Sequence, residues 1–186
     1  MKLPNIFTLM RFLLIPIIIF LLYSSNPNDI LLSIIFFIVA VFTDWLDGFI
    51  ARKYKLKSVF GTFFDPIVDK ILILGIFLVF VDLKLIPLWL VLLLIFREFV
   101  ASGIRQTCSN TKKIVGANWM GKSKFIMQLL VIIYTQVFLY FSYIGKTIIF
   151  FNNTGVYYST LIMTIISLIY ILNFAYWHRE EMFSDI

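Results

Sequence analysis

Six long apolar runs constrain the fold of this chain more than any other feature. A helix needs about 20 largely apolar residues to cross a bilayer, and the segments that approach or reach this length are residues 9–24, 30–50, 62–81, 85–106, 123–144 and 155–177. Hydrophobic residues make up 61% of the sequence, whereas soluble proteins contain roughly 45–50%. The sequence therefore predicts an all-α integral membrane protein with six transmembrane helices.

The first ten residues predict a separate element. Lys2, Pro4 and Asn5 stand among apolar residues there, a pattern typical of a short helix at the membrane interface. The basic start and the apolar run resemble a signal peptide, but no small-x-small cleavage site follows, so we expect a retained span. The chain contains no internal repeat or linker, and residues 1–186 are expected to form one domain.

Basic residues indicate the orientation of the helices. If the N-terminus, residues 51–59, residues 107–122 and the C-terminus share one side, that side holds all of the 16 Lys and Arg residues except Lys84 and Lys146. By the positive-inside rule, the crowded side faces the cytoplasm. The sequence thus predicts a multi-pass protein of the plasma membrane with both termini and its active site cytoplasmic.

Four aspartates fall inside two of the predicted spans: Asp44, Asp47, Asp65 and Asp69. A charge at the centre of a spanning helix costs at least ~2.5–3.5 kcal/mol, so we expect these side chains to face a polar cavity. Asp44 and Asp47 are three residues apart, and Asp65 and Asp69 are four apart. Both spacings place the two side chains on one helix face. Because a short loop joins the two spans, we expect them to be antiparallel neighbours. Such a cage of oxygens suits Mg²⁺ or Mn²⁺ and has room for two ions.

Any one of these aspartates could instead cap a helix end, but small and basic residues accompany all four, namely Gly48, Ala51, Arg52 and Gly61. Small residues let a nucleotide approach the backbone, and Arg52 can bind a phosphate bidentately. Pro66 should kink or interrupt the third span. With one cysteine (Cys108) and one histidine (His178), the chain has no internal disulfide and no Cys/His zinc cluster, so acid–base chemistry falls to carboxylates.

The spacing of these residues resembles a known signature. The run Asp44-Trp-Leu-Asp47-Gly48-Phe-Ile-Ala51-Arg52, then eight residues, then Gly61-x3-Asp65-x3-Asp69, is similar to the pattern D-x2-D-G-x2-A-R-x8-G-x3-D-x3-D of the CDP-alcohol phosphotransferase family. The resemblance implies six transmembrane helices, an N-terminal interfacial helix, a homodimer and two divalent metal ions. It also implies that the partners are CDP-diacylglycerol and membrane lipid, and not a nucleic acid polymer.

The same resemblance assigns a role to each residue of the signature. Asp44 and Asp65 would bridge both metal ions. Asp47 would bind one ion and Asp69 the other, and Asp69 would also be the catalytic base that deprotonates the acceptor hydroxyl. Contacts to CDP-diacylglycerol would come from Asn5, Thr8, Gly48, Ala51, Arg52 and Gly61.

Three further stretches resemble the members of this family that use glycerol 3-phosphate as the acceptor. They are Pro4-Asn5-x2-Thr8-x2-Arg11, then Arg97-Glu98-Phe99 with Ser102-Gly103-x-Arg105, and Trp119-x-Gly121-Lys122-x-Lys124 with Gln128. The resemblance implies transfer of the phosphatidyl group from CDP-diacylglycerol to glycerol 3-phosphate, a step of phospholipid biosynthesis. The sequence departs from these relatives at Ser58 and Phe125, where threonine is usual, and at Val68, where alanine is usual.

Basic residues near the helix ends are the candidates for binding the acceptor phosphate: Arg11, Arg105, Lys122 and Lys124. The positive-inside bias alone also explains loop cations, and Arg97 beside Glu98 is equally compatible with a structural ion pair. Other functions stay open. They are the same chemistry with inositol phosphate, serine or phosphatidylglycerol as acceptor, a structural membrane subunit, and a cation or proton transporter, because acids inside membranes also mark ion pathways.

Overall fold

All regular structure in the described part of the chain is helical. The computed structural model describes residues 3–54, 59–110, 119–145 and 152–177, and within them the side chains of residues 8–46, 48–49, 64–104, 123–145 and 152–176. The helices are α1 (Leu3–Leu22), α2 (Pro27–Tyr54), α3 (Val59–Asp82), α4 (Leu88–Asn110), α5 (Trp119–Ile144) and α6 (Asn153–Trp177). Each covers most or all of one predicted span, which confirms the all-α class.

The N-terminal region differs from the prediction. One continuous helix, α1, covers both the expected interfacial segment and the first expected span. Pro4 does not interrupt it, because the first turn of a helix has no intrahelical acceptor for the missing N–H. The α3 helix likewise continues through Pro66. The prediction of a separate interfacial helix is therefore wrong from residue 3 onward. At Pro66 the helix is not interrupted, and a kink there stays a prediction.

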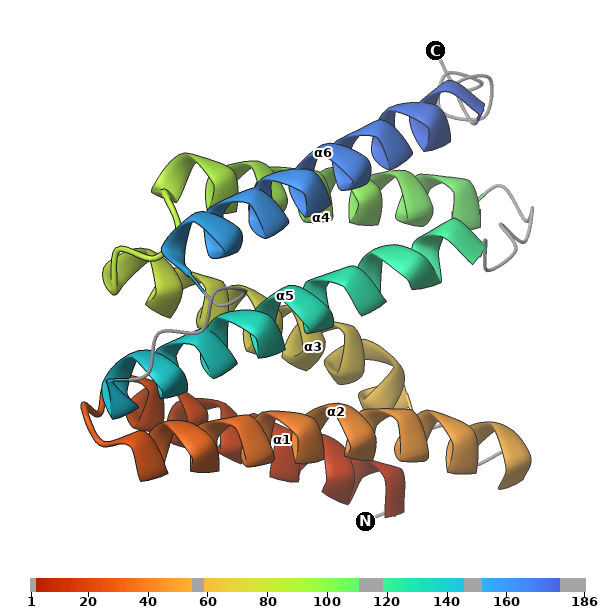
Figure 1. The fold of residues 1–186 in the computed structure, drawn as a ribbon. Coiled ribbons are helices and arrows are strands. Elements are labelled where there is room, and N and C mark those ends of the chain that lie inside the picture. The colour runs from red at the N-terminus through yellow and green to blue at the C-terminus, as the bar shows by residue number, and fades with distance from the viewer. Residues whose placement is uncertain (1–2, 55–58, 111–118, 146–151, 178–186) are drawn as a thin grey trace.

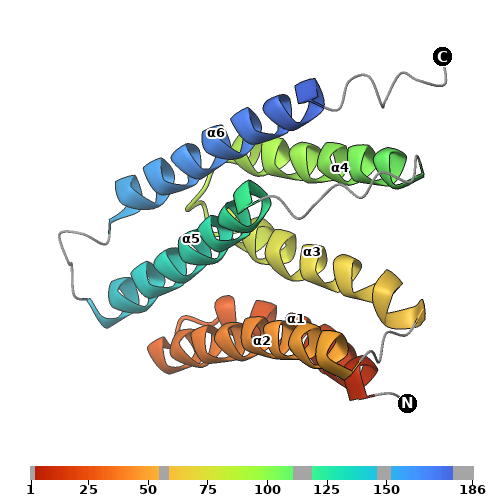
Figure 2. The ribbon, with the colours of Figure 1, turned by 90° about the vertical axis from the view of Figure 1, so that its right-hand side faces the viewer.

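The helices stack in three layers (Figures 1 and 2). Helices α1 and α2 form one outer layer, α3 and α5 form the middle layer, and α4 and α6 form the other outer layer. Contacts of α1 with α3, α2 with α5, α3 with α4 and α5 with α6 join the layers. Fully buried apolar side chains from several of these helices form one core, among them Phe37, Phe77, Leu90 and Ile132.

The packing of α1 corrects one expectation. Helices α2 and α3 were expected to be direct neighbours, but in the part of the chain that the structure describes they do not pack on each other. Instead, α1 packs against both. A short connecting loop limits the distance between two helices but does not exclude a third helix from between them. This placement brings side chains of α1 to the aspartates of α2 and α3.

Helix ends alternate between the two ends of the bundle. The start of α1, the end of α2, the start of α3, the end of α4, the start of α5 and the end of α6 lie on the right in Figure 1, and the other helix ends lie on the left. The segments predicted to share the cytoplasmic side are thus the ones that follow or precede the right-hand helix ends. The arrangement agrees with the expected grouping of the basic segments.

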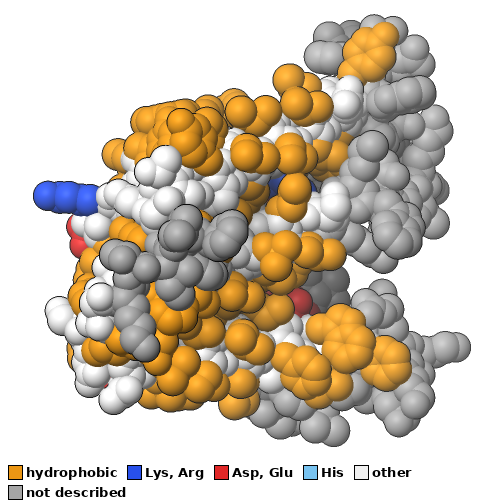
Figure 3. Space-filling model, viewed as in Figure 1, with side chains coloured by type: hydrophobic (Ala, Val, Ile, Leu, Met, Phe, Trp, Pro, Cys, Tyr) orange, Lys and Arg blue, Asp and Glu red, His pale blue; other side chains and the backbone are white. Residues whose placement is uncertain are grey.

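The surface of the bundle is largely apolar (Figure 3). Exposed side chains include Phe20, which is 78% exposed, and Leu172, which is 69% exposed. Three helical segments of the described residues are long and apolar enough to cross a membrane, namely Pro27–Leu46, Ser123–Ile144 and Asn153–Tyr176. An exposed apolar surface of this extent is stable in lipid and not in water. The chain is therefore a membrane protein, while six spans stay a prediction.

Polar residues cap the starts of α2 and α6 and follow the end of α3 at the left side of Figure 1. Before α2, the Asn26 side chain accepts a hydrogen bond from the backbone N–H of Asn28 at 3.1 Å. Before α6, the Asn152 side chain accepts one from the N–H of Gly155 at 2.6 Å. Both are N-cap arrangements. After α3, Lys84 has a left-handed φ of 58°, and the N–H of the next residue, Leu85, reaches the Phe80 carbonyl oxygen at 2.9 Å, as in a Schellman motif.

Candidate active site

Charged and polar side chains from three helices meet inside the bundle. Nη1 of Arg11, on α1, lies 2.8 Å from Oδ1 of Asp44 on α2 and 2.5 Å from Oδ1 of Asp69 on α3. One turn earlier on α1, the Thr8 hydroxyl donates a hydrogen bond to Oδ1 of Asp65 at 2.6 Å. These five residues are called the carboxylate cluster below. They bring three of the four predicted metal ligands together.

Helix geometry explains why these side chains meet. Thr8 and Arg11 are three residues apart on α1, and Asp65 and Asp69 are four apart on α3, so each pair shares one helix face. Because α1 packs on both α2 and α3, its polar face meets the acidic faces of both neighbours. The sequence could place each pair on a face, but it gave no signal that Arg11 lies among the aspartates.

The charges of the carboxylate cluster are only partly balanced. The Arg11 side chain is fully buried, whereas the Asp44 and Asp69 side chains are 33% and 31% exposed. One guanidinium therefore faces two carboxylates, and its Nε and Nη2 atoms have no hydrogen-bond partner among the described residues. Burying charge is costly even when it is paired. Ionisable groups inside the helices of a membrane protein usually have a function.

A metal site of three or more ligands is not formed by the described side chains. Asp44 and Asp69 each direct an oxygen to Arg11, Asp65 directs one to Thr8, and Asp47 lies outside the described side chains. The donor set nevertheless suits a hard divalent cation, because it consists of carboxylate oxygens that already converge on a positive group. A small hollow of about 10 Å³ borders Arg11, Asp44 and Asp69, close to the ~10–15 Å³ that one water molecule needs.

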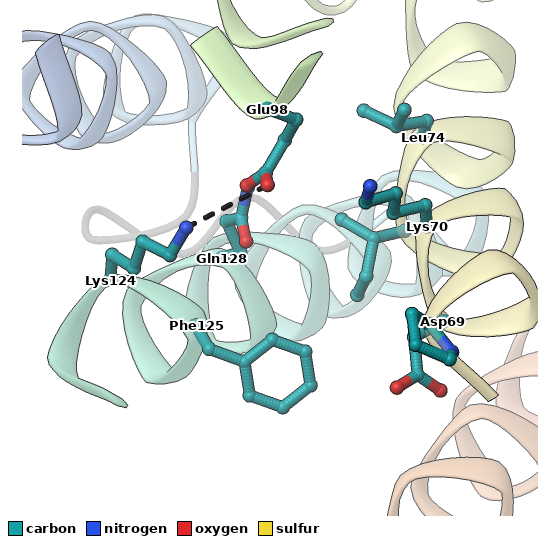
Figure 4. Close-up of a pocket in the computed structure, with 9 residues that line it drawn as sticks. Asp69, Lys70, Leu74, Glu98, Lys124, Phe125 and Gln128 are labelled. Carbon is teal, nitrogen blue, oxygen red and sulfur yellow. Dashed lines mark hydrogen bonds and ion pairs between the residues drawn. The ribbon is translucent and has the colours of Figure 1, made fainter. Parts of the chain in front are cut away.

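A larger cavity of about 220 Å³ lies beside the cluster, between α3, α4 and α5 (Figure 4). Its lining residues are Pro66, Asp69, Lys70, Ile73, Leu74, Glu98, Lys124, Phe125 and Gln128. Pockets for drug-sized molecules measure roughly 300–1,000 Å³, so this cavity suits a smaller molecule. Two ammonium groups and two carboxylates line it, which favours a small ligand that is both anionic and hydrogen-bonding.

Glu98 is the centre of a second polar network. Its carboxylate forms an ion pair with the neighbouring Arg97, and its Oε1 accepts a hydrogen bond from Gln128 Nε2 at 3.2 Å. Lys124 Nζ lies 3.7 Å from the other oxygen, Oε2. Arg97 also reaches across to α6, where its Nε lies 3.4 Å from the Ser167 carbonyl oxygen. The ion-pair alternative for Arg97 and Glu98 is thus confirmed.

Asp69 connects the two polar regions. Its carboxylate is part of the carboxylate cluster through Arg11, and it also lines the 220 Å³ cavity. From this position the Asp69 carboxylate can contact both a ligand held by the aspartates and a ligand held in the cavity. This position is compatible with the prediction that Asp69 binds a metal ion and also deprotonates the acceptor hydroxyl.

The structure places some of the other predicted residues. Gly48 lies half-buried on α2, and Lys124 lines the cavity. Arg11 belongs to the carboxylate cluster and does not line the larger cavity. Its contact with the acceptor phosphate stays a prediction. The remaining predicted residues lie outside the described side chains: Asn5, Asp47, Ala51, Arg52, Gly61, Arg105 and Lys122.

Three polar lining residues of the cavity were not predicted as site residues: Lys70, Glu98 and Gln128. Lys70 Nζ donates a hydrogen bond to the Ser102 hydroxyl at 2.7 Å, which links α3 to α4. Lys124 and Gln128 are four residues apart on α5 and therefore share a face. That spacing was the available signal in the sequence, and it identifies the face of α5 that meets Glu98.

The chain is similar in sequence to known proteins over most of its length. Residues 1–178 match the family model described as CDP-alcohol phosphatidyltransferase. The chain is 37% identical over 143 residues to the CDP-diacylglycerol–glycerol-3-phosphate 3-phosphatidyltransferase of Bacillus subtilis, a match that covers 70% of this chain and 74% of the relative. Proteins of the same name from Rickettsia typhi (37% over 128 residues, 69% and 72% covered) and Salmonella choleraesuis (33% over 133 residues, 69% and 72% covered) are also similar. The chain belongs to the CDP-alcohol phosphatidyltransferase family.

Proposed function

We propose that the protein transfers the phosphatidyl group of CDP-diacylglycerol to glycerol 3-phosphate, giving phosphatidylglycerophosphate and CMP. Family membership supports the reaction class, and the names of the relatives support glycerol 3-phosphate as the acceptor. Family membership also favours a transferase over the transporter and the structural subunit that the sequence left open. The observation that carries the proposal is the position of Asp69, which belongs to the carboxylate cluster and also lines the 220 Å³ cavity.

Asp69 is the proposed base. It accepts the proton of the primary hydroxyl of glycerol 3-phosphate, and the resulting oxygen nucleophile attacks the phosphorus that carries diacylglycerol. A P–O bond to that oxygen forms, and the P–O bond to CMP breaks, so CMP leaves with the bonding electrons. The cavity holds the acceptor beside Asp69 in one orientation, and positioning of this kind converts an encounter between two substrates into a reaction within one complex.

Two divalent ions, Mg²⁺ or Mn²⁺, are the proposed cofactors, held by Asp44, Asp47, Asp65 and Asp69. When bound, such ions neutralise the negative charge of a pyrophosphate and of its leaving group. Arg11 already contacts Asp44 and Asp69, so we propose that it offsets their repulsion. Its unpartnered Nε and Nη2 atoms (within the described residues) keep it a candidate for binding substrate phosphate.

The remaining contacts are proposals carried by the resemblance and by the position of the cavity. CDP-diacylglycerol is expected to lie along α1, α2 and the start of α3, at Asn5, Thr8, Gly48, Ala51, Arg52 and Gly61. Lys124 lines the cavity and is proposed to bind the acceptor phosphate together with Arg11, Arg105 and Lys122. The nucleotide and the acceptor arrive from water while the acyl chains stay in lipid, so a site near one membrane surface is required.

We further propose a homodimer in the plasma membrane with the active site and both termini on the cytoplasmic side. The distribution of basic residues supports this orientation, and the alternation of helix ends in Figure 1 is compatible with it. Cysteines introduced at Lys55 and at Asn153, in a variant without Cys108, should react with an impermeant reagent from opposite sides of the membrane. Labelling of both from one side would contradict the six-span orientation.

A panel of acceptor alcohols tests the proposed function. The purified protein in mixed micelles receives CDP-diacylglycerol, Mg²⁺ and one acceptor: glycerol 3-phosphate, inositol phosphate, serine or phosphatidylglycerol. CMP release and the lipid product are measured together. We expect phosphatidylglycerophosphate with glycerol 3-phosphate and little CMP with the others. CMP release with another acceptor only would overturn the acceptor assignment and leave the reaction class in place.

A further inference from the structure

The 220 Å³ cavity carries polar groups on different sides (Figure 4). Asp69 lies on α3, whereas Glu98 projects from α4 toward the space between the ammonium groups of Lys70 and Lys124. The two lysines can neutralise a phosphate in this space. The proposed function uses the Asp69 carboxylate, but it assigns nothing to the second carboxylate, which is buried and lines the same cavity.

Glu98 is held firmly by one of its two oxygens. Arg97 and Gln128 both contact Oε1, and Arg97 is itself fixed by the Ser167 carbonyl oxygen of α6. The side chain is only 11% exposed. A carboxylate anchored from three helices has little rotational freedom, so the position of its second oxygen is fixed relative to the cavity.

The second oxygen, Oε2, keeps acceptor capacity. Among the described side chains, the cation beside it is Lys124, whose Nζ lies 3.7 Å away. This distance is longer than the 2.7–3.2 Å of a hydrogen bond from nitrogen. An ionised carboxylate oxygen accepts more than one hydrogen bond. If Glu98 and Arg97 served stability alone, two apolar side chains of similar volume would be equally or more stable in their place.

The acceptor alcohol offers the close hydrogen-bond donor that Oε2 lacks among the described side chains. Glycerol 3-phosphate carries a primary hydroxyl, a secondary hydroxyl and a phosphate. The primary hydroxyl must face Asp69, and the phosphate is attracted to the lysines, so the secondary hydroxyl is left to contact another wall of the cavity. Because Lys and Arg cannot accept hydrogen bonds, Glu98 is the anionic acceptor available to that hydroxyl among the lining residues outside the base.

We propose that Glu98 is a specificity-determining residue, and that its Oε2 accepts a hydrogen bond from the secondary hydroxyl of the acceptor alcohol. Arg97 and Gln128 are positioning residues that hold Glu98. The inference rests on the proposed function, because it takes glycerol 3-phosphate as the acceptor. It adds a means of selection: an alcohol phosphate without a secondary hydroxyl leaves a buried anionic oxygen without its donor.

The first experiment compares two acceptors on the wild-type protein. Glycerol 3-phosphate and 3-hydroxypropyl phosphate differ only in the secondary hydroxyl, and CMP release gives kcat/KM for each. A hydrogen bond to a charged group corresponds to a factor of about ten to one hundred, so we expect the analogue to have a kcat/KM lower by that factor. Equal values for the two acceptors would overturn the inference without any variant.

The second experiment separates recognition from structural charge balance. Glu98→Gln keeps the length of the side chain and removes its charge, whereas Glu98→Asp keeps the charge for Arg97 and draws the oxygens back by one methylene. We expect the ratio of kcat/KM between glycerol 3-phosphate and the analogue to fall toward one in Glu98→Gln. In Glu98→Asp we expect this ratio to fall by about threefold or more, because the shorter side chain lengthens the hydrogen bond to the secondary hydroxyl. Thermal unfolding in detergent is measured alongside.

The acceptor ratio distinguishes the possible results. A purely structural Glu98 would lower activity on both acceptors equally, leave the ratio at its wild-type value, and thereby contradict the inference. If neither variant folds, the wild-type comparison alone decides. Failure of the proposed function gives a different result. If the wild type releases CMP with another alcohol but not with glycerol 3-phosphate, the proposed function is wrong. If it is equally active with glycerol 3-phosphate and with 3-hydroxypropyl phosphate, only the proposed role of Glu98 is wrong.

Discussion

In the half of the bundle nearer the start of α1, polar side chains bind one another across helices, whereas at the opposite end the side chains of Asn26 and Asn152 bind the backbone of their own turn. Arg11 joins Asp44 and Asp69 from three helices. Asn152, in contrast, accepts a hydrogen bond from an N–H three residues away. The first kind of contact buries charge, and the second satisfies a helix end that would otherwise lack a partner.

The two regions therefore make opposite contributions to stability. N-cap side chains typically contribute ~0.5–2 kcal/mol, and they need no further explanation. A buried arrangement of like charges around one cation is at best a weak source of stability. Substitutions in the turn region should accordingly change the free energy of unfolding without changing the chemical step, and substitutions in the carboxylate cluster should do the reverse.

Metal removal has the largest expected effect. Treatment with a chelator should abolish CMP release, because Asp44, Asp47, Asp65 and Asp69 are proposed to hold the ions that neutralise the pyrophosphate. Added Mg²⁺ or Mn²⁺ should restore turnover. The measurement is the initial rate before chelation, after chelation and after addition of metal. Substantial turnover in the chelated protein would refute the metal proposal.

Replacement of the proposed base comes next. Asp69→Asn should lower the chemical step by ~10²–10⁴-fold, the usual worth of a positioned base, while CDP-diacylglycerol binding changes far less. Single-turnover kinetics with saturating lipid measures the step, and equilibrium binding of the lipid nucleotide is the control. If binding is lost and the single-turnover rate survives, Asp69 serves substrate binding and not proton transfer.

A cation of the cavity should affect the acceptor alone. Lys124→Ala should raise KM for glycerol 3-phosphate by about ten- to hundredfold, because a hydrogen bond to a charged group is worth ~1.5–3 kcal/mol, and the affinity for CDP-diacylglycerol should stay near the wild-type value. Steady-state kinetics in each substrate checks this. Lys124 also lies near Glu98, so thermal unfolding of the variant is the control for an indirect loss. An unchanged KM would remove Lys124 from the acceptor site.

The smallest expected effect belongs to the turn after α3. Lys84 adopts a φ of 58°, a conformation that costs a residue with a side chain roughly 1–2 kcal/mol. Glycine avoids this cost, but its more flexible unfolded state offsets ~0.5–1 kcal/mol of the stabilisation. Lys84→Gly should thus stabilise the fold by at most about 1.5 kcal/mol. Gly145, with a φ of 75°, is the matched control, since Gly145→Ala should destabilise. Both leave kcat unchanged; a large loss of activity in either would break the contrast between the two regions.

The positions of the helices could be predicted because each needs a long apolar run, and the runs are visible in the sequence. Helix ends were harder to predict. Helix α1 begins before the expected span because Pro4 is tolerated in a first turn. Which helices pack together was not predictable from loop length, and the sequence therefore wrongly placed α2 directly beside α3.

The site shows the same limit. The sequence alone shows that Asp65 and Asp69, four residues apart, share one helix face. The contact of Arg11 with Asp69 joins residues 58 positions apart, and no local pattern encodes it. The sequence marked Glu98 as part of a stretch that resembles relatives using glycerol 3-phosphate and as half of an ion pair, but the role proposed for its second oxygen depends on a cavity formed by α3, α4 and α5 together.

One paired measurement tests the central claim that buried charge serves chemistry while the turns serve the fold. Asp44→Asn and Asn152→Ala are assayed side by side for CMP release and for melting temperature in one detergent. Asp44→Asn should lose nearly all turnover and keep its melting temperature, since Arg11 stays paired with Asp69. Asn152→Ala should keep kcat and melt a few degrees lower, as expected for the loss of a cap of ~1 kcal/mol. An active but less stable Asp44→Asn would contradict the account.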